Sequence, residues 1–303
     1  MTTSLSKENL NPWWVTGLSD AESSFIVNIF KNKEYICNWQ VQPIYSIELH
    51  IKDLSLLYKI KQFFGVGRIK LRKNKSSAIY YVASLNDLID IIIPHFIKYP
   101  LLTKKYADFL LFKMVVELMK TKNHLNEIGL QKIINIRASM NKGLTEILKS
   151  NFPNFIAIDR SIVNLESPFE PFWVLGFCDG ESNFDIRINQ SKTYKISYQV
   201  QLRFRITQHN RDQLLLTNFI NFFNCGQIEQ IKSRTAINYI VTNFKNITIN
   251  IIPFFKKYSL LSSKSLDFSK IAILISSNAH LTTLGLKEIQ SIKARMNSKR
   301  IYE

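Results

Sequence analysis

The chain has 303 residues, of which 46% are hydrophobic, and its 40 Lys and Arg against 23 Asp and Glu give a formal net charge of +17. This length is enough for two cores of ordinary domain size. No apolar run approaches the roughly 18 residues of a membrane span, and the mean hydropathy is −0.04. We therefore expect a soluble protein without a membrane partner, and the basic charge indicates a polyanionic partner.

Three cysteines, Cys37, Cys178 and Cys225, share no CxxC spacing. This pattern disfavours a disulfide framework or a zinc site and favours free thiols in a reducing compartment.

The second half of the chain repeats the first. The segment Pro12–Glu22 returns as Pro171–Glu181 at an offset of 159 residues. The same offset relates His50, Asp53, Gly67, Tyr99 and Lys105 to His209, Asp212, Gly226, Tyr258 and Lys264. Beyond these pairs the offset falls to 156, as a three-residue deletion would produce. A register kept over roughly a hundred residues indicates two copies of one structural unit.

Each copy predicts the same order of elements. A helix over 12–22 or 171–181 is followed by two long strands that alternate apolar and polar residues. A second helix is predicted over 53–64 and 212–224. A short strand pair is predicted over 66–72 and 78–83, matched by 226–232 and 236–242, and further helices over 86–96 and 104–119. The expected fold class is α+β, with two pseudo-symmetric αββαββα repeats that each carry an antiparallel four-stranded sheet.

The copies are joined by a segment with two prolines and no amphipathic period, Phe152–Pro168. We expect an N-terminal repeat over 1–150, a linker over 151–167 and a C-terminal repeat over 168–303.

The outward rows of the strands are rich in Arg, Lys, Gln and Asn, the side chains that contact base edges and phosphates in DNA. A solvated sheet face is the alternative, but the recurrence of these rows in both halves disfavours it. Candidate DNA contacts in the first half are Ser24, Asn28, Asn38, Gln40, Gln42, Ser46, Glu48, Arg68, Lys70, Arg72 and Tyr80. In the second half they are Asn183, Asp185, Arg187, Asn189, Lys195, Ser197, Gln199, Gln201, Arg203, Arg205, Thr207, Gln227, Glu229, Lys232 and Tyr239.

The repeated segments carry a resemblance to a known family. Val15–Ser23 and Val174–Ser182 resemble the two LAGLIDADG motifs of a single-chain homing endonuclease. His50–Asp53, Lys98–Lys105 and His124–Leu125 are similar to the fungal mitochondrial intron-encoded branch typified by the Onu enzyme. The last motif position, usually Gly, is Ser here. The resemblance implies motif helices packed at an interface, with cleavage across the minor groove that leaves four-base 3′ overhangs.

The motifs also predict the chemistry. Small residues four apart form one flat stripe on each motif helix: Gly17/Ala21 and Gly176/Gly180. Pairing of these stripes would set Glu22 beside Glu181 at the negative ends of two helix dipoles, where both stay ionised only if a cation compensates. Oxygen ligation predicts Mg²⁺, with Mn²⁺ or Ca²⁺ as substitutes for binding. The resemblance implies that the carbonyls of Ala21 and Gly180 also coordinate, and in-line attack by water on each strand follows the two-metal pattern.

Further site residues come from the repeat and from the family. Lys105 and Lys264 are expected to lower the pKa of the attacking water or to stabilise charge on the phosphate. Gln208 is expected to act near the catalytic water of the second copy, where the first copy has Leu49. Asp20 and Asp179 project away from the glutamates around the helix and are expected to be structural.

The expected function is therefore site-specific cleavage of double-stranded DNA by a monomer. Strands of about nine residues span roughly nine base pairs, so two halves cover a target of about 18–22 base pairs. The outward residues differ between the copies, which predicts an asymmetric target. An RNA maturase that acts on its own intron RNA is the alternative, and a silent DNA-binding regulator would lack one Glu. The residues Met1–Leu10 do not resemble a presequence for mitochondrial import. The abundance of Ile, Asn, Lys and Phe favours synthesis inside a mitochondrion.

Overall fold

The computed structural model describes residues 10–73, 76–161, 169–193, 197–231, 235–277 and 282–296. It consists of two compact units that divide between positions 164 and 165. None of the described helices combines the length and the apolar composition that crossing a bilayer requires.

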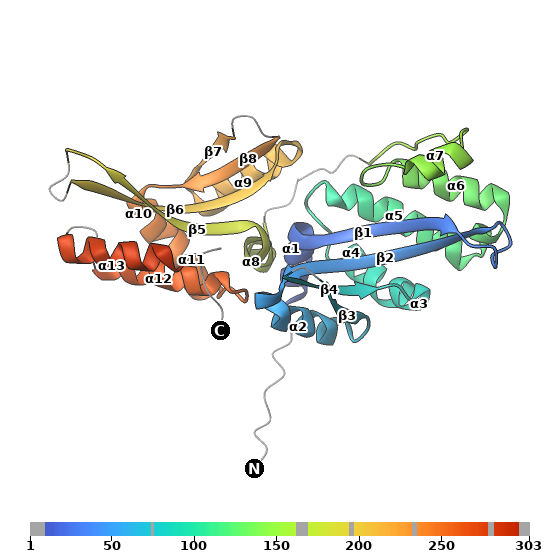
Figure 1. The fold of residues 1–303 in the computed structure, drawn as a ribbon. Helices are drawn as coiled ribbons and strands as arrows, with labels where there is room; N and C mark the ends of the chain where they lie inside the picture. Colours follow the sequence, from blue (N-terminus) through green and yellow to red (C-terminus); the bar gives the residue numbers. More distant parts are fainter. Residues whose placement is uncertain are drawn as a thin grey trace, which may run out of the picture. The chain divides into compact units, whose positions relative to one another are not determined.

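The first unit contains one antiparallel sheet of four strands in the order β1-β2-β4-β3 (Figure 1). Its elements are α1 (Pro12–Glu22), β1 (Ser23–Lys31), β2 (Trp39–His50), η1 (Ile51–Asp53), α2 (Leu54–Phe64), β3 (Arg68–Leu71), β4 (Ser77–Val82), α3 (Leu85–Asp87), η2 (Leu88–Ile92), α4 (Ile93–Lys98), α5 (Lys105–Lys120), η3 (Asn123–Leu125), α6 (Glu127–Ala138) and α7 (Glu146–Asn151).

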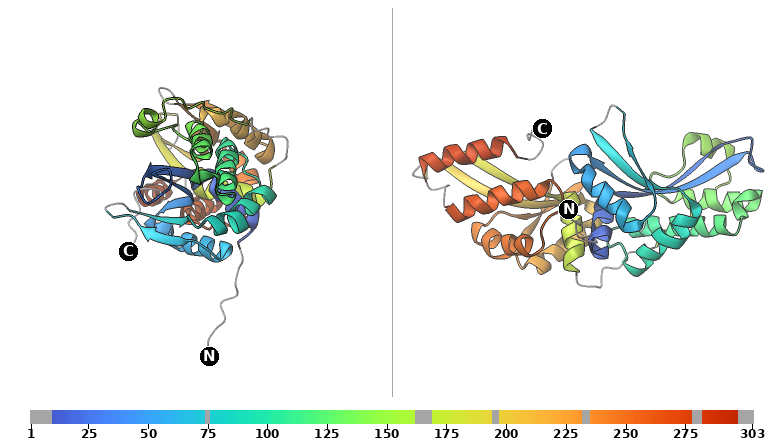
Figure 2. Two further views of the ribbon diagram at one scale, coloured as in Figure 1. Left: turned by 90° about the vertical axis from the view of Figure 1, so that its right-hand side faces the viewer. Right: turned by 90° about the horizontal axis from the view of Figure 1, so that it is seen from below.

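The second unit repeats this topology with the strand order β5-β6-β8-β7 (Figure 2). Its elements are α8 (Pro171–Glu181), β5 (Ser182–Gln190), β6 (Tyr198–His209), η4 (Asn210–Asp212), α9 (Gln213–Phe223), β7 (Gln227–Gln230), β8 (Ala236–Val241), α10 (Phe244–Asn246), η5 (Ile247–Ile251), α11 (Ile252–Lys257), α12 (Lys264–Ser277) and α13 (Thr283–Ala294). The predicted α+β class and the two antiparallel four-stranded sheets are confirmed.

In the described part of the chain, helices pack on one face of each sheet, and aromatic side chains fill the space between the helices and the sheet. In the first unit, Phe25 of β1 contacts Phe96 of α4 and Phe109 of α5, with ring centroids 5.4 Å apart in both pairs. The corresponding ring of the second unit, Phe184, contacts Phe255 and Phe268 at 5.4 and 5.5 Å. Burial of these rings contributes to the driving force for folding of each unit.

Strand register puts two predicted DNA contacts, Tyr80 and Tyr239, inside these cores, so that prediction is wrong. Both side chains are fully buried. The Tyr80 hydroxyl donates to the Val66 carbonyl at 3.1 Å, and the Tyr239 hydroxyl donates to the Cys225 carbonyl at 2.9 Å. On β4 and β8, the outward positions are occupied by the residues immediately before and after each tyrosine.

The two buried tyrosines explain one repeated glycine. Gly67 and Gly226 have φ of +85° and +89°, and a Cβ at either would lie 2.6 or 2.5 Å from the ring of Tyr80 or Tyr239. A side chain at this position would be strained in its backbone and would clash with the ring.

One difference between the motif helices also follows from the core. The Ser19 hydroxyl donates to the Val15 carbonyl at 2.7 Å and accepts from the Tyr45 hydroxyl at 2.7 Å. At the 159-residue offset the second unit has Cys178 and Phe204, both buried. A polar pair in one unit is therefore replaced by an apolar pair in the other, so that neither leaves a buried hydroxyl without a partner.

A buried histidine joins α1 to α4 in the first unit. Thr16 Oγ1 lies 3.1 Å from His95 Nε2 and donates to the Tyr99 carbonyl at 3.1 Å. Because the hydrogen of the Thr16 hydroxyl is directed to the Tyr99 carbonyl, His95 Nε2 donates to Thr16 Oγ1. Burial lowers the pKa of His95 from 6.5 to about 4.

This histidine should make the protein sensitive to acid. The unfolded chain takes up the imidazole proton below pH 6.5, whereas the folded chain does so only below about pH 4. Stability should therefore fall as the pH drops from 6.5 to 4, by roughly 3 kcal/mol from this group. Urea unfolding at several pH values should show a smaller loss over this range for His95→Gln than for the wild type. Equal losses in both proteins would contradict the assignment.

The described part of the expected linker packs against the first unit. Ser139 Oγ donates to the Ile158 carbonyl at 2.6 Å, and Arg160 forms an ion pair with the buried Asp108 at 2.9 Å. Residues 162–168 lie outside the described residues.

Candidate active site and nucleic-acid interface

The two motif helices, α1 and α8, have the same start and the same end. Each begins with a proline in its first turn, where the missing N–H costs nothing. Each ends at a half-buried glutamate, Glu22 or Glu181. The serine that follows donates its hydroxyl to a carbonyl of the last turn at 2.6 Å, from Ser23 to Ser19 and from Ser182 to Cys178. The serine that departs from the family motif therefore caps its helix.

A buried aspartate next to the end of α1 holds the loop before α5. Asp20 is 3% exposed. Its carboxylate accepts from the backbone N–H of Leu102 at 2.8 Å, from the N–H of Thr103 at 3.1 Å and from the Thr103 hydroxyl at 2.6 Å. Thr103 Oγ1 in turn accepts from the N–H of Lys105 at 3.1 Å. The structural role predicted for Asp20 is confirmed, and it determines where α5 begins.

The second unit has the same arrangement. Asp179, 4% exposed, accepts from the N–H of Leu261 at 3.1 Å and from the N–H of Ser262 at 2.8 Å. The Ser262 hydroxyl accepts from the N–H of Lys264 at 3.4 Å. In both units, therefore, a buried aspartate and a hydroxyl side chain position the lysine with which the next helix begins.

Both lysines return to the end of the motif helix of their own unit. Lys105 Nζ donates to the carbonyl of Ser19 at 2.9 Å and to the carbonyl of Ala21 at 3.3 Å. Lys264 Nζ donates to the carbonyls of Cys178 and Gly180. The negative end of a helix dipole and its unpaired carbonyls favour a cation at this place. The structure therefore brings together Glu22, Ala21 and Lys105, and likewise Glu181, Gly180 and Lys264.

The end of each motif helix presents oxygen atoms that could bind a metal. Among the residues that the structure describes, no group of three or more His, Cys, Asp or Glu side chains could hold a metal. Each helix end offers one carboxylate and one carbonyl that already accepts from an ammonium group. Such oxygen donors fit a hard divalent cation.

The outward face of the first sheet carries most of the predicted polar row. Strand pairing sets Ser24 opposite Ser46, and Asn28 opposite Gln42. Ser46 is 3% exposed, so its neighbours cover it in the free protein. The other predicted residues on this face are Gln40, Glu48, Arg68, Lys70 and Arg72, and Glu48 accepts from Arg72 at 3.0 Å and from the Ser77 hydroxyl at 2.7 Å.

The outward face of the second sheet is more strongly charged. Asp185 accepts from Arg203 Nε at 2.7 Å and from a terminal nitrogen of Arg205 at 2.8 Å. Thr207 donates to Asn238 at 2.8 Å, and Asn238 donates to Glu229 at 3.3 Å. The remaining predicted residues on this face are Asn183, Arg187, Asn189, Gln199, Gln201 and Gln227.

Several predicted contacts lie elsewhere. Asn38 and Ser197 have φ of 56° and 57° in the turns that precede β2 and β6. Gln208 pairs with Ile237 of β8, and strand alternation puts it on the side of Phe204 that faces the helices. Its catalytic role stays a prediction that the register does not support. Lys195 and Lys232 lie outside the described residues.

The sequence interpretation missed some residues of the outward faces. Ile26 pairs with Ile44, Glu48 pairs with Ile79, and Ser46 pairs with Tyr81, so these apolar and aromatic side chains belong to the outward row of the first sheet. Strict two-residue alternation from Ser24 and Asn28 would have identified Ile26.

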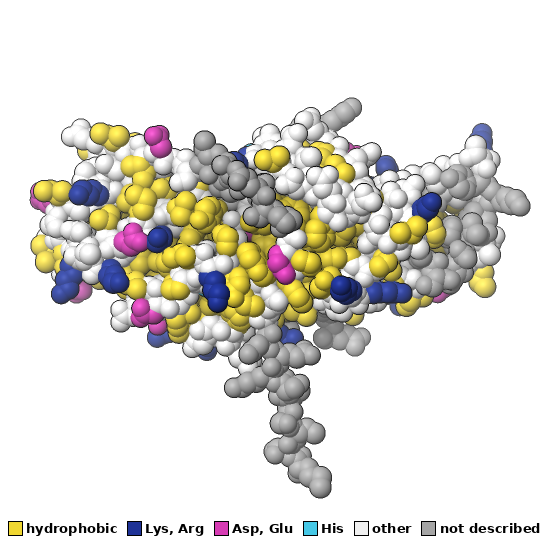
Figure 3. Space-filling view, turned by 180° about the vertical axis from the view of Figure 1, so that it is seen from behind, with side chains coloured by type: hydrophobic (Ala, Val, Ile, Leu, Met, Phe, Trp, Pro, Cys, Tyr) yellow, Lys and Arg dark blue, Asp and Glu magenta, His cyan; other side chains and the backbone are white. Residues whose placement is uncertain are grey.

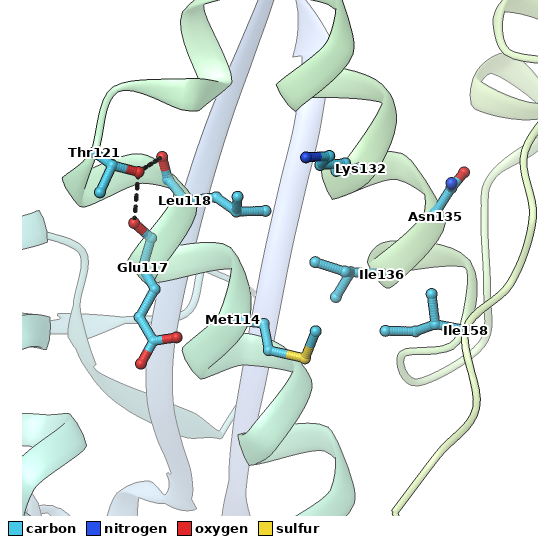
Figure 4. A pocket seen from close by; sticks show the side chains of 8 residues that line it. All are labelled: Met114, Glu117, Leu118, Thr121, Lys132, Asn135, Ile136 and Ile158. Atoms are coloured by element: carbon cyan, nitrogen blue, oxygen red, sulfur yellow. Dashed lines mark hydrogen bonds between the residues drawn. The ribbon is translucent and has the colours of Figure 1, made fainter.

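A cavity of about 480 Å³ in the first unit is separate from these residues. It lies between α5 and α6, and Figure 4 shows the side chains of Met114, Leu118, Ile136 and Ile158 around it. None of the predicted site residues lines it.

A comparison with protein families matches this chain to the LAGLIDADG endonuclease model over residues 15–116 and 174–275. Two curated relatives from Neurospora crassa are named probable intron-encoded endonuclease 3 and probable intron-encoded endonuclease 2. The first is 39% identical over 291 residues and the second 42% identical over 298 residues. Each match covers 94% of this chain, but only 54% and 64% of the relatives, so the chain spans roughly half to two thirds of their length.

Solved structures are similar over nearly the full chain. The I-SmaMI LAGLIDADG homing endonuclease bound to cleaved DNA is 43% identical with a TM-score of 0.93, over 96% of this chain and 98% of that one. The I-LtrWI LAGLIDADG homing endonuclease bound to target DNA is 38% identical with a TM-score of 0.93, over 98% of this chain and 100% of that one. I-SmaMI has also been solved with an uncleaved DNA target in the presence of calcium ions.

Proposed function

This chain belongs to the LAGLIDADG endonuclease family, and from that premise we propose that it is a site-specific endonuclease that hydrolyses both strands of a DNA duplex. The observation that carries the proposal is the repeated helix end. In both units a glutamate ends the motif helix, and a lysine donates to the carbonyl that precedes this glutamate. A buried aspartate in each unit anchors the loop that leads to the lysine. A purely structural role in capping the helix would not require the same glutamate, lysine and buried aspartate in two units of different sequence.

The proposed cofactor is Mg²⁺, held by Glu22 and the Ala21 carbonyl in one unit and by Glu181 and the Gly180 carbonyl in the other. The solved relative with calcium supports use of a divalent ion. Bound there, the ion would supply Lewis-acid activation of water and charge stabilisation at the scissile phosphate. Lys105 and Lys264 would contribute a positive charge to the phosphate.

The proposed target is a long asymmetric duplex bound along the outward faces of the two sheets. β1 and β5 have nine residues each, and strands of this length reach along roughly nine base pairs. This supports a target of about 18–22 base pairs. The proposal also includes cleavage by a single chain that leaves 3′ overhangs. The face drawn in Figure 3 shows basic side chains interspersed with acidic and hydrophobic ones, whereas the outward rows are rich in base-reading side chains.

The gene context is also part of the proposal. The relatives are named as intron-encoded endonucleases of a fungus, and the composition favours a mitochondrial genome. We therefore place the chain inside the mitochondrion as the product of a group I intron. The arrangement of glutamates and lysines favours cleavage over the maturase alternative, which could dispense with metal.

The proposal is tested by selection for cleavage from a randomised pool of duplexes of about 24 base pairs, with Mg²⁺ and separately with Ca²⁺. Recovery of one long asymmetric site that is cut with Mg²⁺ and only bound with Ca²⁺ is expected. Tight binding to intron RNA, without cleavage of any duplex in Mg²⁺ or Mn²⁺, would overturn the proposal in favour of the maturase.

A further inference from the structure

The two sheets carry different chemistry at one matched position on their outward faces. In the second unit, Asp185 of β5 pairs directly with Arg203 of β6. The residues at the 159-residue offset in the first unit are Ile26 of β1 and Ile44 of β2, which pair in the same register. An ion pair in one sheet thus corresponds to an aliphatic pair in the other, although the backbones are equivalent.

A carboxylate on a surface that meets DNA needs an explanation, because phosphates repel it. Asp185 is held between two arginines, with Arg203 Nε at 2.7 Å and Arg205 Nη2 at 2.8 Å. The three side chains are 15%, 22% and 29% exposed, respectively. Two guanidinium groups and one carboxylate leave the cluster with one net positive charge, so it still attracts DNA.

The ion pairs orient the arginines without using up their donors. A guanidinium has five N–H groups, and each arginine gives one nitrogen to Asp185. Arg205 Nε is buried without a hydrogen-bond partner among the described residues. Both long side chains are ordered before any DNA binds, which removes part of the entropy cost of recognition. Arg203 keeps its two terminal nitrogens and Arg205 keeps one, and these N–H groups can meet acceptors on a base edge.

The chemistry selects the base pair. In the major groove guanine presents two acceptors, O6 and N7, and its partner cytosine presents an amino donor. Arginine donors fit the first and a carboxylate fits the second. Ile26 and Ile44 offer no hydrogen bonds, and an apolar contact suits the methyl group of thymine.

We propose that Asp185 is a positioning residue that holds Arg203 and Arg205 for guanine, so that the half-site bound by the second unit requires G·C pairs where the half-site bound by the first unit requires A·T. Asp185 lies four residues beyond Glu181, and Ile26 lies four residues beyond Glu22. At about 3.3 Å per residue this is roughly 13 Å, or about four base pairs from each glutamate along the duplex. The inference rests on the proposed function, because it assumes that the outward faces bind duplex DNA.

The test is a binding selection from the randomised duplex pool with the full chain in Ca²⁺, followed by sequencing of every position. The wild type should enrich G·C about four base pairs from the centre in one half-site and A·T at the matched position in the other. Asp185→Asn should reduce the G·C preference about tenfold at the two adjacent base pairs read by the arginines. Preferences elsewhere should stay unchanged. Asn189→Ala, further along β5, is the control and should leave these two base pairs unaffected.

A transplant completes the test. The double variant Ile26→Asp with Ile44→Arg should import a G·C preference into the matched position of the other half-site. Loss of stability in Asp185→Asn with an unchanged base profile would show that the ion pairs only support the sheet, and would overturn the inference. An effect confined to one base pair would show that Asp185 contacts cytosine rather than positioning both arginines. If the wild type enriches no duplex at all, the proposed function fails as well, whereas enrichment of a site without G·C at this position overturns the inference alone.

Discussion

Replacing Glu22 by Gln should lower the single-turnover rate of double-strand cleavage by at least about a thousandfold, and Glu181→Gln should do the same. Gln has nearly the shape of Glu but carries no charge, so the end of the motif helix would lose the anionic ligand for a divalent cation. Glu22 is half-buried at the end of α1 and not on the outward face of the sheet. Affinity for the target duplex should therefore stay within about threefold.

The measurement compares plasmid cleavage in Mg²⁺ with duplex binding by fluorescence anisotropy in Ca²⁺. Glu117→Gln is a matched control, because this side chain lies on α5, is 59% exposed and pairs with Lys113 one helical turn away. It should cleave like the wild type. A Glu22→Gln protein that cleaves both strands at the wild-type rate would show that the acid is structural.

Replacing Asp20 by Ala should destabilise the first unit by roughly 3 kcal/mol. The carboxylate is buried and accepts from two backbone N–H groups and one hydroxyl. Removal of the acceptor leaves these donors buried without their partner, a larger cost than the loss of an exposed hydrogen bond. The loop before α5 would also lose its anchor, so the Lys105 ammonium should leave the Ala21 carbonyl and cleavage should fall together with stability.

Urea unfolding followed by circular dichroism gives the size of this effect as a shift of the midpoint at constant slope. Asp90→Asn, an exposed change in the same unit, should stay within about 0.5 kcal/mol of the wild type. Asp179→Ala should give a similar loss in the second unit, where the aspartate accepts from Leu261 and Ser262. A loss below about 1 kcal/mol for Asp20→Ala would mean that water or a nearby side chain replaces the carboxylate.

The two units share the arrangement of residues at the end of the motif helix but differ in the side chains of their outward sheet faces. In both units the aspartate, the hydroxyl residue whose backbone N–H donates to it and the lysine have the same arrangement. The outward rows differ, with Ile26 and Ile44 in the first unit and Asp185 and Arg203 in the second. In the proposed function, catalysis at the two helix ends would need one geometry for two similar phosphates. Recognition by the sheets would need different side chains for different bases.

The order of elements followed from local signals in the sequence. Alternation in residues 182–190 predicted β5, and the repeat carried that assignment into β1 even where the apolar pattern was less regular. The turn glycines Gly67 and Gly226 recurred at the correct offset, and the structure shows that each leaves space for a buried tyrosine ring. These signals act within a few residues of one another, so a single chain without relatives was enough to predict them.

Three features of the site depended on contacts between distant residues. Asp20 and Thr103 lie 83 residues apart, and no local pattern links them. Tyr80 and Tyr81 are chemically alike neighbours, and only the pairing of β4 with β2 decides which one faces the helices. Ile26 and Ile44 are absent from the predicted outward row, although their register places them there.

The sequence by itself determined that the chain contains two copies of one unit, that each copy ends its first helix in a glutamate, and that basic and amide side chains line its strands. Residue type and two-residue or helical periodicity are enough for these conclusions because they are properties of short segments. Only the tertiary structure decided that Asp20 anchors the start of α5, that Lys105 donates to the Ala21 carbonyl, that Tyr80 is buried, and that Asp185 accepts from two arginines. Each of these depends on strand register or on the packing of a loop against a helix, and therefore on the free energy of the whole unit rather than on the preferences of neighbouring residues.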